Sequence, residues 1–207
     1  MSHASFIVKI CGITNEEDAR IAIQAGANAV GFNFYPRSPR YIAPERARQI
    51  AAATPGDYLK VGVFVKPSVK RLLQVASQVP LDVVQLHGDS VALPSSRTLR
   101  VWRALPATAA PPPAYSGIEA YLLDSPTPHH GGSGETFDWS LAARFPHRAI
   151  IAGGLDASNV AEAIRITSPW GVDSCSRLES APGKKDAQRV RDFICAAFAA
   201  ARQEVTL

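Results

Sequence analysis

Short apolar segments alternate with segments of mixed polarity along most of the 207-residue chain. Runs of four to seven mainly apolar residues predict buried strands, and apolar residues at helical spacing between them predict helices. The predicted strands cover residues 7–11, 29–34, 59–65, 83–87, 99–105, 119–123, 149–152 and 170–173. In the first of them, side-chain alternation places Ile7, Lys9 and Cys11 on one face and Val8 and Ile10 on the other.

The segments between these strands follow a helical pattern in most places. Helices are predicted at residues 15–25, 44–53, 68–77, 156–166 and 185–201, with a short one near 138–145 and an indistinct helical region after Gly88. The exception is 106–117, which is rich in alanine and contains three consecutive prolines. Proline removes a backbone donor and clashes with the preceding helical turn, so we interpret this segment as a degenerate fifth helix on the outside.

Eight strands separated mainly by helices predict a (β/α)8 TIM barrel, with residues 1–207 forming a single catalytic domain. A chain of this length can bury one substantial core. No window holds 18 consecutive apolar residues and no secretory signal is visible, so we expect neither a membrane partner nor export.

The three cysteines and the net charge of +4 narrow the candidate functions further. An odd number of cysteines without CxxC spacing argues against a disulfide framework or a zinc site, and a reducing cytoplasm fits best. The basic residues are scattered rather than clustered, so no nucleic-acid partner is expected. A small anionic ligand suits this charge.

Function in such barrels lies at the carboxyl ends of the strands, where this sequence places several polar side chains and glycines. They are Cys11, Arg40, His87, Asp124, Gly153, Gly154 and Asp173. A thiol and a carboxylate at two strand ends, Cys11 and Asp124, can form a general acid–base pair. Glycine-rich segments after strands six and seven favour a phosphate site built from backbone N–H groups.

Six segments together resemble the phosphoribosylanthranilate isomerase family of tryptophan biosynthesis. They are Lys9–Thr14, Gly31–Ile42, Val84–Gly88, Gly131–Trp139, Ala152–Leu155 and Glu179–Asp186. The resemblance covers essentially the whole chain. It implies an isomerase that performs an Amadori rearrangement on a phosphorylated small molecule, without a metal or an organic cofactor.

The resemblance also assigns roles to individual residues. Cys11 matches the family's general base, Asp124 its general acid, and Arg40 the residue that holds the substrate carboxylate. The remaining positions implied to bind the substrate are His87, Gly132, Ser133, Gly134, Gly154, Asp173 and Ser176, of which Asp173 lies near the sugar. Cys175 and Cys195 are expected to be structural, with Cys195 on the apolar side of the last helix.

Several questions stay open at this point. Lys9 either lowers the pKa of the Cys11 thiol or forms an internal salt bridge with a carboxylate of another strand. Arg177, where the family commonly has glycine, either turns outward toward Glu179 or reaches the phosphate; we favour the outward position. The alternative functions are a sibling phosphosugar ketol isomerase, which uses two aspartates, and a non-catalytic barrel that binds a phosphate ligand. The chain could act as a monomer or a homodimer.

Overall fold

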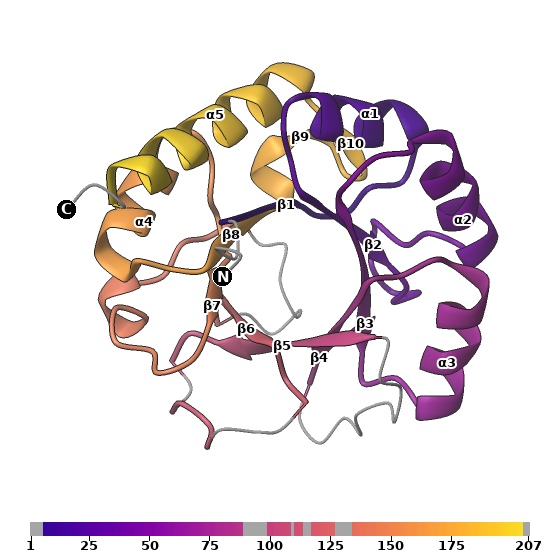
Figure 1. Ribbon diagram of the computed structural model, residues 1–207, viewed down its shortest axis with the longest axis horizontal. Helices are drawn as coiled ribbons and strands as arrows, with labels where there is room; N and C mark the ends of the chain where they lie inside the picture. The colour runs from indigo at the N-terminus through magenta and orange to yellow at the C-terminus, as the bar shows by residue number, and fades with distance from the viewer. Residues whose placement is uncertain (1–5, 89–98, 109, 114–116, 127–133, 205–207) are drawn as a thin grey trace.

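The computed structural model describes residues 6–88, 99–108, 110–113, 117–126 and 134–204, and shows a closed barrel of eight parallel strands in sequence order (Figure 1). The barrel strands are β1 (Ile7–Ile10), β2 (Ala29–Asn33), β3 (Leu59–Val65), β4 (Val83–His87), β5 (Arg100–Pro106), β6 (Ala120–Asp124), β7 (Ala149–Ile151) and β8 (Gly171–Ser174). This is the predicted TIM barrel.

Helices surround the strands on the outside of the barrel (Figure 1). They are α1 (Glu16–Gln24), α2 (Pro44–Ala53), α3 (Val69–Gln78), α4 (Val160–Thr167) and α5 (Ala187–Glu204), with 3-10 turns η1 (Trp139–Leu141) and η2 (Ser176–Leu178). The described residues between β5 and β6 form no helix, as their prolines require. The helical region expected after Gly88 lies outside the described residues.

Side-chain alternation along the strands separates two apolar layers. One fills the barrel interior and includes Ile7, Val61, Trp102 and Ile150, while the larger one lies between the strands and the helices. The predicted faces of β1 are confirmed, because Ile7 points inward and Val8 and Ile10 point outward. Lys9 is therefore directed into the barrel, and its side chain has no exposed area.

Three predicted boundaries were wrong for local reasons. Helix α4 begins at Val160 instead of residue 156, because the Asn159 amide holds a turn by accepting from Asp156 N at 2.9 Å and donating to Gly154 O at 2.9 Å. Such side-chain bonds to the backbone compete with helix formation. The short helix near 138–145 is only the turn η1.

The third boundary concerns a hairpin that the sequence pattern did not predict. Strands β9 (Glu179–Ala181) and β10 (Lys184–Lys185) pair antiparallel outside the barrel. Lys185 therefore belongs to a strand, and α5 begins at Ala187, with the Asp186 carboxylate accepting from two backbone N–H groups of its first turn.

No helix in the described part of the chain is long and apolar enough to cross a membrane.

Candidate active site

The sequence-predicted site residues gather at the carboxyl ends of the strands. Cys11 directly follows β1, His87 ends β4, Asp124 ends β6, and Asp173 lies in β8. Gly154 follows β7, Arg40 lies in the loop after β2, and Ser176 opens η2. Gly132 and Ser133 fall outside the described residues.

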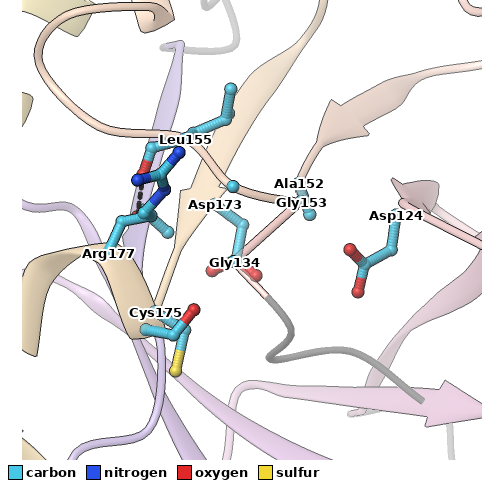
Figure 2. A pocket seen from close by; sticks show the side chains of 11 residues that line it. Asp124, Gly134, Ala152, Gly153, Leu155, Asp173, Cys175 and Arg177 are labelled. Carbon is cyan, nitrogen blue, oxygen red and sulfur yellow. Dashed lines mark hydrogen bonds between the residues drawn. The ribbon is translucent and has the colours of Figure 1, made fainter. Parts of the chain in front are cut away.

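An open pocket lies among the ends of β6, β7 and β8 (Figure 2). Its lining includes Asp124, Gly134, Gly154, Asp173, Cys175 and Ser176. Figure 2 shows the carboxyl groups of Asp124 and Asp173 on two sides of this space, with the Cys175 sulfur below them. The pocket therefore unites the predicted acid with three residues of the predicted phosphate site.

The glycine segments come together as expected for a backbone phosphate site. A Cβ atom on Gly154 would lie 2.8 Å from Gly134 O, and one on Gly134 would lie 3.5 Å from Ser176 Oγ. Three chain segments thus approach one another closely because side chains are absent there. Backbone N–H groups exposed in this way, next to the start of η2, can hold an anion.

Asp124 lies where a carboxyl group keeps its proton more readily than in water. Burial, together with the nearby Asp173 carboxylate, raises its pKa to about 6, while the Ser125 N–H, which donates to Asp124 Oδ1 at 2.8 Å, and Lys9 oppose this rise. Gly153 has φ +82°, and a Cβ there would lie 3.0 Å from Asp124 Oδ1. A glycine at this position therefore leaves room for the carboxyl group.

The Cys11 thiol is buried beside Lys9 and close to a second thiol, Cys175. A Cβ on Gly31 would lie 2.8 Å from Cys11 Sγ, so Gly31 makes the space that the thiol occupies. A hydrogen bond to Cys175 and burial raise the pKa of the Cys11 thiol well above its usual value, although Lys9 acts to lower it. Lys9 therefore acts on the Cys11 pKa in the direction that one interpretation predicted, but the pKa is not lowered overall because Cys175 and burial outweigh Lys9.

Lys9 forms the internal ion pair that was the alternative interpretation. Its ammonium donates to Asp173 Oδ1 at 2.8 Å across the β1–β8 pairing. Burial works to lower the pKa of Lys9, but Asp173 and Cys11 hold it above its usual value. Lys9 therefore stays charged, and it affects the electrostatics of Cys11 and Asp124 alike.

Cys175 is not the inert thiol that the sequence suggested. Lys185 Nζ lies 3.7 Å from Cys175 Sγ and donates to the Cys175 carbonyl oxygen at 3.1 Å. The hydrogen bond from Cys11 lowers the pKa of Cys175 to about 7, helped by Lys185 and Arg40 and opposed by burial. The third cysteine, Cys195, is exposed rather than on the apolar side of α5.

Arg40 is held by a carboxylate of the unpredicted hairpin. Its guanidinium donates to both carboxylate oxygens of Glu179, from Nε to Oε1 at 2.9 Å and from Nη2 to Oε2 at 2.7 Å. Lys185 Nζ donates to the same Oε1 at 3.0 Å. Burial acts against the charge on Glu179, yet Arg40 and Lys185 hold its pKa below the usual value.

Two further residues complete this arrangement, and one of them, Arg177, also lines the pocket. His87 Nε2 is 2.8 Å from Gln85 Nε2, which fixes its ring at the end of β4. The Arg177 side chain is half exposed, and its Nε lies 3.8 Å from Asp156 Oδ2. The suggested pairing of Arg177 with Glu179 was therefore wrong, because Glu179 binds Arg40 and Lys185 instead.

Sequence reasoning missed Cys175, Glu179 and Lys185 as a group around the base. The only signal for Glu179 and Lys185 was their position in the sixth segment of the family resemblance. Cys175 had no such signal, because only the pairing of β1 with β8, with Lys9 opposite Asp173 and Ile10 opposite Ser174, brings it next to Cys11. Within the described residues, no group of three or more His, Cys, Asp or Glu side chains could hold a metal ion.

Residues 8–196 match the sequence model of a family described as N-(5'-phosphoribosyl)anthranilate (PRA) isomerase. A protein of that name from Solibacter usitatus is 53% identical over 198 residues, which is 94% of this chain and 98% of that protein.

Solved structures give the same result. One is a phosphoribosyl anthranilate isomerase in complex with reduced 1-(o-carboxyphenylamino)-1-deoxyribulose 5-phosphate, with 36% identity, a TM-score of 0.78, and coverage of 94% of this chain and 100% of that one. Another shows monomers generated from the dimeric enzyme of Thermotoga maritima, with 37% identity, a TM-score of 0.80 and the same coverage. The chain therefore belongs to the N-(5'-phosphoribosyl)anthranilate isomerase family.

Proposed function

We propose that this protein isomerises N-(5-phosphoribosyl)anthranilate to 1-(2-carboxyphenylamino)-1-deoxyribulose 5-phosphate, an Amadori rearrangement in tryptophan biosynthesis. The observation that carries the proposal is the placement of a buried thiol, Cys11, and a carboxyl group of raised pKa, Asp124, around one ammonium group at the end of a TIM barrel. An acid and a base held in different environments are what this proton-transfer reaction needs.

The proposed reaction begins at Asp124. Its pKa of about 6 keeps a fraction of the carboxyl groups protonated near neutral pH. Asp124 donates this proton to the ribose ring oxygen, the bond from that oxygen to C1 breaks, and a protonated imine forms between C1 and the anthranilate nitrogen.

Cys11 acts in the second step. As a thiolate it removes the proton from C2 of the sugar, and the electron pair left behind neutralises the imine nitrogen. The resulting enolamine tautomerises to the ketone. The proton now on Cys11 returns to Asp124 through solvent, which restores both groups for the next turnover.

The other predicted residues would bind and orient the substrate. Gly134, Gly154 and Ser176, with Gly132 and Ser133 expected from the sequence, would hold the phosphate through backbone N–H groups. Arg40 would bind the anthranilate carboxylate, since its planar fork suits that group. His87 and Asp173 would contact the sugar, and the ion pair with Lys9 fixes the position of Asp173.

The setting of the enzyme follows from this chemistry. We expect the whole chain, 1–207, to work as one domain. Because Cys11 must remain a free thiol, we also expect a reducing compartment such as the cytoplasm. The dimeric Thermotoga maritima relative favours a homodimer, and a monomer is the alternative.

A fluorescence assay tests the proposed function. Purified protein is mixed with freshly prepared phosphoribosylanthranilate, and the loss of anthranilate fluorescence is followed against a protein-free blank. We expect turnover that is lost in Cys11→Ala. Binding of a phosphate ligand without loss of fluorescence would instead support a non-catalytic barrel, and turnover of only another phosphosugar would support a sibling isomerase.

A further inference from the structure

Cys175 is placed beside Cys11 by the pairing of β1 with β8. Lys9 lies opposite Asp173 and Ile10 opposite Ser174, so the next residues in register are the two cysteines. The Cys11 N–H donates to Ser174 O at 2.9 Å, which continues this pairing beyond the strands. Each thiol shifts the pKa of the other, as two groups in close contact do.

The cations around Cys175 exceed the anions. Arg40 and Lys185 both bind the single carboxylate of Glu179, and the Lys185 side chain has no exposed area. Lys185 Nζ lies 3.7 Å from Cys175 Sγ. Two positive charges thus share one carboxylate. Glu179 Oε1 lies 3.9 Å from Cys175 Sγ and opposes a negative charge there, but the second cation outweighs it, so a negative charge on Cys175 would balance the group.

The charges on the Cys11 side are balanced instead. Lys9 is the ammonium group beside Cys11, and it forms an ion pair with Asp173 at 2.8 Å. The groups that face the two thiols are therefore Lys9 on β1, Arg40 after β2, Asp173 on β8, Glu179 on β9 and Lys185 on β10. This arrangement favours one negative charge on the thiol pair, nearer to Cys175.

We propose that Cys11 and Cys175 act as one base: the two sulfurs share a single proton, and Cys175 takes that proton when Cys11 attacks the substrate. This inference rests on the proposed function and deepens it. In the free protein the proton lies on Cys11 and the charge on Cys175. When the substrate carboxylate binds Arg40, it neutralises the surplus charge, and the proton moves from Cys11 Sγ to Cys175 Sγ.

The step changes neither the number of protons nor the redox state of the pair. One S–H bond breaks at Cys11 and one forms at Cys175, and the Cys11 thiolate then accepts the C2 proton. The directions of the two pKa shifts agree with such a unit, because the pKa of Cys175 is lowered to about 7 while that of Cys11 is raised. Interacting groups of this kind titrate as a pair. Cys175 is thus a positioning residue for the proton of Cys11.

Titration of the thiols without substrate tests the pair directly. The absorbance of thiolate is measured against pH in a Cys195→Ser background, which removes the exposed third thiol. We expect one thiolate with a midpoint near 7. In Cys11→Ala the midpoint of Cys175 should rise by about one unit toward the ordinary thiol value of about 8.5. A midpoint that stays near 7 in Cys11→Ala, or no thiolate by pH 8 in the parent, overturns the proposal.

The pH profile of Cys175→Ser supplies the second test. Without its partner, Cys11 should ionise at a higher pH than the thiol pair, because burial still opposes its charge. The wild-type to variant ratio of kcat/KM should therefore fall at least about tenfold between pH 7 and pH 9.5. The contribution of Asp124 cancels in this ratio. A merely structural role would lower kcat/KM by the same factor at every pH, and that result overturns the proposal. If only the proposed reaction is wrong, the protein shows no turnover while the titration result stands.

Discussion

The two sides of the candidate site treat ionisable groups in opposite ways. On the β6 side, burial and a neighbouring carboxylate raise the pKa of Asp124 to about 6. On the β1–β8 side, Lys185 and Arg40 help a hydrogen bond to lower the pKa of Cys175 to about 7. The Asp124 carboxyl group, which is normally ionised, keeps its proton more readily, and the Cys175 thiol, which is normally protonated, loses its proton more readily. These environments favour proton donation at Asp124 and a negative charge on the Cys11–Cys175 pair, which is the division of roles that the proposed reaction needs.

Removing the acid or the base should have the largest effect on turnover. Cys11→Ala and Asp124→Asn should each lower kcat by about 10²–10⁴-fold, because each proton transfer depends on one positioned group. The loss of anthranilate fluorescence measures this, and urea unfolding serves as the control for folding. A Cys11→Ala variant with the wild-type kcat would contradict the assignment of the base.

Lys9 acts on the pKa values of both Cys11 and Asp124, so Lys9→Met tests the electrostatics of the two sides together. The substitution leaves the buried Asp173 without its ammonium partner, and loss of one member of a buried pair typically costs about 3–5 kcal/mol of unfolding free energy. Urea unfolding measures the loss, and Lys9→Met with Asp173→Asn should recover part of it. The thiolate midpoint should also rise, and an unchanged midpoint would remove Lys9 from the electrostatics of the base.

Arg40 lies on the base side and is expected to act mainly by binding the substrate carboxylate, without itself donating or accepting a proton. Arg40→Ala should raise KM by about 10–100-fold, the equivalent of one or two charge-assisted hydrogen bonds, and lower kcat far less. Steady-state kinetics separate the two constants. Glu179 keeps Lys185 as a partner in this variant. A larger effect on kcat than on KM would place Arg40 nearer to the reacting carbons.

Asp124 should also affect how the stability of the fold depends on pH. Its pKa of about 6 in the folded state exceeds the unfolded value of about 3.9, so its contribution to stability is lost as the pH rises from about 4 through about 6. Between pH 5 and pH 8 this amounts to about 1 kcal/mol. Relative to wild type, Asp124→Asn should therefore be more stable at pH 8 than at pH 5. A difference that does not change with pH would contradict the raised pKa.

Arg177 should matter least. Its half-exposed side chain lies 3.8 Å from Asp156, and exposed ion pairs contribute about 0–1 kcal/mol. Arg177→Gly should change KM and unfolding free energy little. Phosphate binding that weakens more than about tenfold, most strongly at low salt, would show that the guanidinium reaches the anion.

The strands and the faces of β1 could be predicted because alternation needs no knowledge of neighbours. The residues that surround the base Cys11 could not be predicted in this way. The register that brings Cys175 to Cys11 depends on how β8 pairs with β1, and a strand's own sequence does not contain that information. Strands of three and two residues, such as β9 and β10, are also too short to show alternation, so Glu179 escaped notice as the shared partner of Arg40 and Lys185.

The β9–β10 hairpin also links the two ends of the chain. Thr14 Oγ1 donates to Gly183 O at 2.6 Å, and Lys185 N donates to Asp18 Oδ2 at 2.8 Å, across sequence separations of 169 and 167 residues. Contacts between residues so far apart in the sequence form slowly, because a long loop must close before they are made. During synthesis the cations around the thiol pair can assemble only after residue 185 has emerged. The surroundings of the base are therefore complete only when nearly the whole chain has been synthesised.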